Sequence, residues 1–196
     1  MGKFSNERIN KDLKSIMSQF RDSYKSMSDA SRLEYIKTLA PGANVPEEGR
    51  IYGDDRRAEF ESMCQGYRAK VSDFIQGAIK DLKNKVTESP SPDAVNTITL
   101  LNLRSDVTPE EIDDLIDRYG DNVQAYKAIV SIANEKKIKG LDVIHPIEIE
   151  IRDAEDLESA IERSLNIASA TSGHTSDAFL DMIDLQIDNA FPTDGE

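Results

Sequence analysis

Few side chains in this sequence are of the types that carry out covalent chemistry or bind transition metals. Cys64 is the only cysteine, and the two histidines are His145 and His174. Cys64 falls within an apolar helical stripe, where a buried and unreactive thiol is expected, and both histidines occur in stretches typical of solvent-exposed loops. The chain has no Gly-Lys-Ser/Thr phosphate loop and no His-Glu-x-x-His zinc motif. We therefore expect no catalytic residues, no metal ligands and no cofactor.

Two adjacent aspartates form a pattern that suggests a divalent metal. Tyr52-Gly53-Asp54-Asp55 is similar to the metal-binding turn of nucleic-acid polymerases, and this resemblance implies a magnesium- or manganese-dependent enzyme. In that family the turn joins two apolar strands of a palm domain, whereas here a polar loop precedes it and the helical segment 56–60 follows. We instead expect Asp54 to be a helix N-cap and Asp55 to lie in the first helical turn.

An acidic stripe occurs near the C-terminus, where Asp177, Asp181, Asp184 and Asp188 recur at helical spacing. Such a stripe is typical of the solvated side of an amphipathic helix. The functional alternative is a row of carboxylates that imitates phosphates and occupies a nucleic-acid site on another protein. In that case the chain would be a small acidic inhibitor of a host nucleic-acid-binding defence protein.

The overall charge restricts the classes of partner. The 196 residues include 24 Lys and Arg against 37 Asp and Glu, a net charge of −13. This charge argues against nucleic acid or an anionic membrane as a direct partner. The N-terminus lacks the apolar segment of a signal peptide, no apolar run is long enough to span a membrane, and one cysteine suits a reducing compartment. We expect a cytoplasmic protein.

The charge is distributed unequally along the chain. Residues 1–86 contain 16 basic and 13 acidic residues, whereas residues 87–196 contain 8 basic and 24 acidic residues. One interpretation is a strongly solvated acidic face. The other is electrostatic pairing of a basic N-terminal helix with an acidic C-terminal helix, within one protomer or between protomers.

Apolar periodicity predicts helices throughout the N-terminal half. Residues 5–27 form one amphipathic stripe, a second short helix follows from about Asp29 to Leu39, and the longest helix covers 54–86. Because that helix would be roughly 50 Å long, it should pack along the first helix, along a partner, or both. We expect self-association through four residues of its stripe: Phe60, Tyr67, Phe74 and Ile75.

The middle of the chain predicts a small helical module. A Ser-Pro linker at 87–92 precedes it, and Ser91 can cap the first helix, whose first residue is a proline. Thr108 and Glu111 have the spacing of a reciprocal capping box at the start of the next helix. A third helix, which either Asp121 or Asn122 can open, completes the module.

Strand-like alternation interrupts this helical pattern at one place. Ile147, Ile149 and Ile151 alternate with glutamates, which is the period of a strand. Because the sequence offers no partner strand, we predict an extended interaction arm. Helices at 154–170 and about 176–191 follow it.

Three segments resemble known proteins: NTITLLNL at 96–103, VTPEEI at 107–112 and YGDNVQAYKAI at 119–129. They resemble helical proteins encoded by phages and prophages of Gram-positive bacteria. The resemblance covers less than a quarter of the chain and rests on helix-capping and core positions. It implies virion assembly or interaction with a host protein, in the host cytoplasm or the virion, and it transfers no catalytic residue.

The sequence thus predicts an all-α helical bundle with one long amphipathic helix, a small central helical module and a short extended arm before acidic C-terminal helices. The expected divisions are 1–86, 87–92, 93–140 and 141–196. The expected function is that of a non-enzymatic, homo-oligomeric interaction protein, a scaffold-like or accessory component in virion head assembly that contacts itself, a capsid protein or a host protein.

Overall fold

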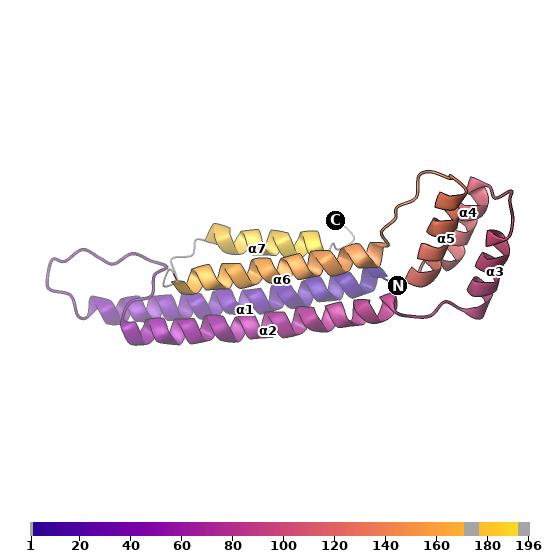
Figure 1. Ribbon diagram of the computed structural model, residues 1–196. Coiled ribbons are helices and arrows are strands. Elements are labelled where there is room, and N and C mark those ends of the chain that lie inside the picture. Colours follow the sequence, from indigo (N-terminus) through magenta and orange to yellow (C-terminus); the bar gives the residue numbers. More distant parts are fainter. Residues whose placement is uncertain (1, 171–176, 192–196) are drawn as a thin grey trace. The chain divides into compact units, whose positions relative to one another are not determined.

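A computed structural model describes residues 2–170 and 177–191, and the side chains of residues 7–170 and 181–191. Every regular element in these residues is an α-helix (Figure 1). The helices are α1 (Gly2–Ile36), α2 (Asp54–Val86), α3 (Pro92–Asn102), α4 (Pro109–Tyr119), α5 (Val123–Glu135), α6 (Pro146–Ala170) and α7 (Asp177–Ala190). The all-α fold expected from the sequence is confirmed.

The chain divides into two compact units whose boundaries fall inside α2 and α6. The first, here called the bundle unit, comprises Met1–Ala78 and Asp153–Glu196, and the second, the small module, comprises Ile79–Arg152. This division differs from the one expected from the sequence. The acidic C-terminal helices join the N-terminal helices in one unit, because their apolar faces are buried together with those of α1 and α2.

The bundle unit contains α1, α7 and the adjoining parts of α2 and α6 (Figure 1). Apolar side chains fill the interior of this unit, and the largest fully buried ones are Leu13, Met17, Phe20, Ile51, Phe60, Ile75, Ile161, Leu165 and Phe191. Aromatic contacts join α1 to α2: the ring of Phe20 meets that of Tyr67 edge-on at 5.4 Å. The long helix therefore packs along the first helix, one of the arrangements expected from its length.

α1 is a single helix, so the separate short helix predicted from about Asp29 to Leu39 is wrong. Ser28 and Ser31 lie on its buried face and bond to the loop that follows: the Ser28 hydroxyl donates to the Arg50 carbonyl at 3.3 Å, and the Tyr52 N–H donates to the Ser31 hydroxyl at 3.2 Å. The loop thus satisfies hydroxyl groups on the buried face of α1.

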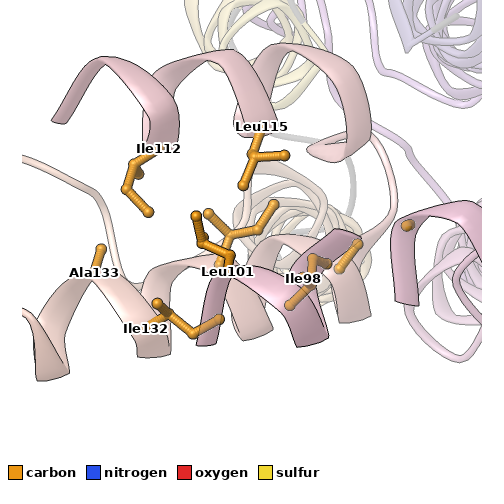
Figure 2. Close-up of a cluster of buried hydrophobic side chains, with 9 residues drawn as sticks. Ile98, Leu101, Ile112, Leu115, Ile132 and Ala133 are labelled. Atoms are coloured by element: carbon orange, nitrogen blue, oxygen red, sulfur yellow. The ribbon is translucent and has the colours of Figure 1, made fainter. Parts of the chain in front are cut away.

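The small module has its own core between α3, α4 and α5 (Figure 2). Figure 2 shows Ile98 and Leu101 from α3 pointing toward Ile112 and Leu115 from α4. The helix starts expected from the sequence are confirmed. Ser91 and Asn122 accept hydrogen bonds as N-caps, and both bonds of the capping box are formed at the start of α4.

The extended arm predicted at Ile147, Ile149 and Ile151 is wrong, because all three residues lie in the first turns of α6. Pro146 occupies the first helical position, where its missing N–H costs nothing. The N–H of Ile147 donates to Nδ1 of His145 at 3.1 Å. Local capping thus starts a helix in a segment whose apolar residues alternate.

Candidate protein-interaction surfaces

The paired aspartates lie at the start of α2 and serve as helix-terminal residues. Gly53, with φ +86°, precedes the helix, and its carbonyl accepts the first helical hydrogen bond from the Arg57 N–H at 3.0 Å. Gly53 therefore takes the N-cap place expected for Asp54. Asp54 and Asp55 both fall in the first turn, where the helix dipole favours carboxylates.

A cavity of about 430 Å³ adjoins this turn, between the end of α1 and the start of α2. Tyr35 and Tyr52 stack beside it with ring centroids 4.8 Å apart. Two of its carboxylates are held by one arginine, because Arg56 donates to Glu34 at 2.8 Å and to Glu59 at 2.6 Å. Within the described residues, no group of three or more His, Cys, Asp or Glu side chains is placed to hold a metal ion.

Cys64 and His145 both have structural surroundings. Cys64 is buried in the bundle core, as expected, and this burial raises the pKa of its thiol to about 11. His145 lies in a loop, as expected, but the exposure expected for it is wrong: the side chain is buried, and Nε2 lies 2.8 Å from the carbonyl oxygen of Gly120. That oxygen can only accept, so Nε2 carries the proton and Nδ1 accepts from Ile147. His174 lies outside the described residues.

The acidic stripe of α7 lies against the basic face of α1, and we call this contact the α1/α7 seam. Lys14 Nζ is 2.6 Å from Asp188 Oδ1, and Arg21 Nη2 is 2.8 Å from Asp184 and 3.3 Å from Asp181. Part of the charge asymmetry of the sequence therefore reflects pairing of a basic and an acidic helix within one protomer. The side chain of Asp177, the fourth member of the stripe, lies outside the described ones.

A buried asparagine fixes the seam at one level. Asn10 Nδ2 donates to Asp188 Oδ1 and to the Phe191 carbonyl, each at 2.9 Å, and the Asn10 side chain is buried. Hydrogen bonds from Asn10 and then Lys14 hold the pKa of the Asp188 carboxyl below its usual value. Buried amides of this kind specify helix register, because any other register leaves them unpaired.

The four residues expected to mediate self-association lie within the bundle unit. Phe60 and Ile75 are buried in its core, and Tyr67 and Phe74 are half-buried. Tyr67 also places its hydroxyl 3.1 Å from that of Ser23 on α1. A contact between copies through Phe60 or Ile75 would require the bundle unit to open.

The outer face of α3 exposes large apolar side chains in the folded protein, so a contact there does not require any unit to open. Leu100 is 65% exposed, Leu103, the C-cap residue of α3, is 80% exposed, and Val95 is also exposed. Beside them, a groove of about 290 Å³ between α3 and α4 is lined by Leu101 and Leu115. This surface was not predicted from the sequence. A usable signal was present, because the segment 98–103 has more apolar residues than one face of a short helix can bury.

The chain matches no protein-family model, no curated protein sequence and no solved structure. Among the helices of the described residues, none combines the length and apolar content that crossing a bilayer demands.

Proposed function

We propose that the protein is a non-enzymatic interaction protein that self-associates through the outer face of α3. The observation that carries this proposal is the exposure of Leu100 on α3 and of Leu103, the C-cap residue of α3, while the inner face of this helix is already buried in the small module. Large apolar side chains gathered on one surface of an otherwise highly charged protein are typical of protein–protein contact sites.

A second copy of α3 is the occupant proposed for this surface. Leu103 of one copy would enter the partner's groove between α3 and α4, and the same contact would form in reverse, as in a two-fold symmetric dimer. Arg104 and Glu111 form an ion pair at 2.7 Å at the side of that groove. This pair supplies a polar rim around an apolar centre, the usual composition of an interface.

The resemblance of residues 96–129 to phage-encoded helical proteins supplies the proposed context. In that context the protein is a scaffold-like or accessory component of virion head assembly, acting in the host cytoplasm or the virion. Its partners would be itself and a capsid or host protein, without direct contact to nucleic acid. Inhibition by phosphate mimicry is less well supported, because Asp181, Asp184 and Asp188 would have to leave Lys14 and Arg21.

The test is the absolute mass by light scattering on a sizing column at about 50 mM and about 500 mM salt. We expect a dimer or larger species, and we expect Leu103→Asp to reduce it to a monomer. Leu33→Asp is the matched control, because Leu33 is a 60% exposed leucine on α1. A monomer for the unaltered protein at both salt concentrations would refute self-association. Dissociation by Phe74→Asp with no effect of Leu103→Asp would assign the contact to the α2 stripe instead.

A further inference from the structure

α7 presents three faces, and the described side chains of the chain cover two of them. Ile183 and Ile187 are buried in the bundle core, and the acidic face meets α1 at the α1/α7 seam. The third face carries Met182, Leu185 and Gln186. Met182 is 46% exposed and Leu185 is also exposed, so this face presents apolar side chains to solvent.

A groove runs between this third face and α6. It forms a cavity of about 360 Å³, whose apolar part includes Leu157 and Ala160. Gln186 also lines it, and Gln186 Oε1 is shielded from solvent without a hydrogen-bond partner. Because an unpaired buried acceptor costs about 1–3 kcal/mol, this oxygen favours an occupant that brings an N–H donor.

The charge around the groove favours a cationic donor. Over residues 153–170, α6 carries five acidic residues and one basic residue. Glu158 is held by Ser72 and Gln76 of α2, whereas Asp156 lines the groove and is exposed. The groove is thus negative beside its unpaired acceptor. Ile167 of α6, 54% exposed, adds an apolar side chain to the same helix.

We propose that the α6/α7 groove binds a basic amphipathic helix of a partner protein. Apolar side chains of that helix pack on Met182 and Ala160, and a lysine or arginine lies beside Asp156. That cation donates to Gln186 Oε1 once the Gln186 side chain turns toward the groove that it lines. The inference deepens the proposed function by naming a second surface and the chemistry of its partner. It rests on the protein being an interaction protein, but it does not depend on the α3 contact.

The experiment measures binding of a fluorescein-labelled peptide by fluorescence anisotropy to the full chain. The peptide has 14 residues, the length of α7, and consists of leucines at helical spacing with lysines between them. A peptide with glutamates in place of the lysines is the control for apolar attraction alone. We expect Asp156→Lys and Met182→Asp each to weaken binding at least about tenfold.

Two variants outside the groove serve as matched controls, and both should change binding by less than about twofold. Asp113→Lys changes an exposed acid on α4, and Leu33→Asp changes an exposed leucine on α1. Equal weakening by Asp113→Lys and Asp156→Lys would show attraction to the overall charge and overturn the proposal, as would tight binding of the glutamate peptide. If Met182→Asp lowers the mass of the protein in solution, a second copy of the chain occupies the groove, and the proposal of a basic partner helix is also overturned. If Leu103→Asp dissociates the oligomer and the peptide still binds, the α6/α7 groove binds its partner independently of the α3 contact, as proposed.

Discussion

Asn10 should control how often the bundle unit opens, and Cys64 can report that opening. Asn10→Ala removes two hydrogen bonds of 2.9 Å, to Asp188 and to the Phe191 carbonyl, in a buried setting. Each such bond contributes about 1 kcal/mol net, so the variant should lose about 2 kcal/mol. Because 1.36 kcal/mol corresponds to a factor of ten, the open population should rise about 30-fold.

The assay is the rate at which Cys64 reacts with a disulfide reagent under native conditions. Cys64 is the only cysteine and is fully buried, and burial raises the pKa of its thiol to about 11, so it reacts only from an opened state. Asn166→Ala, an exposed asparagine on α6, should leave the rate unchanged. An increase below about threefold for Asn10→Ala, or an equal increase for Asn166→Ala, would refute the role of Asn10 in holding α7 on α1.

Four further outcomes are expected, each checked by urea unfolding followed by circular dichroism. Ile129→Ala, at a fully buried position in the small-module core, should cost about 2–5 kcal/mol; a cost below about 1 kcal/mol would contradict that packing. Thr108→Ala should cost about 1 kcal/mol by removing the capping box of α4, and Thr108→Ser should restore it. Lys137→Gly should raise the free energy of unfolding by about 1 kcal/mol, because Lys137 has φ +61° after α5 and glycine adopts that conformation without strain. A decrease would show that contacts of the lysine side chain outweigh the backbone strain. Because the pKa of Asp188 is lowered in the folded state, its stabilisation is present at neutral pH and is lost as the pH falls below about 4; Asp188→Asn should make stability less dependent on pH in that range.

The sequence predicted most helices because their signals are local. Ser91, Thr108 and Asn122 each accept a hydrogen bond from a backbone N–H three residues later, so a few neighbouring residues determine each start. The long helix was predicted at its observed bounds, because its apolar stripe continues from Asp54 to Val86 without interruption.

The features that the sequence did not predict depend on distant partners. His145 is buried by contact with Gly120, which is 25 residues away, and no local pattern indicates that contact. Periodicity favoured a strand at Ile147, although Pro146 already marked a possible first helical position. An apolar stripe also looks the same whether its own chain or a second copy covers it, so the burial of Phe60 and Ile75 within the bundle required the structure.

The same ion pairs determine how salt should act on the two proposed contacts. Lys14 and Arg21 offset most of the charge of the three aspartates that they contact, so most of the net charge of −13 lies outside the seam and opposes the approach of a second copy. Salt shortens the range of that repulsion from about 10 Å at 0.1 M to about 3 Å at 1 M, while the apolar contact of Leu103 is not screened. Added salt should therefore strengthen self-association through α3, whereas it weakens the partly exposed α1/α7 seam and the attraction of a cationic helix to the α6/α7 groove. Charged contacts between the ends of different copies, which the sequence suggested, would instead give an oligomer that dissociates as salt is added.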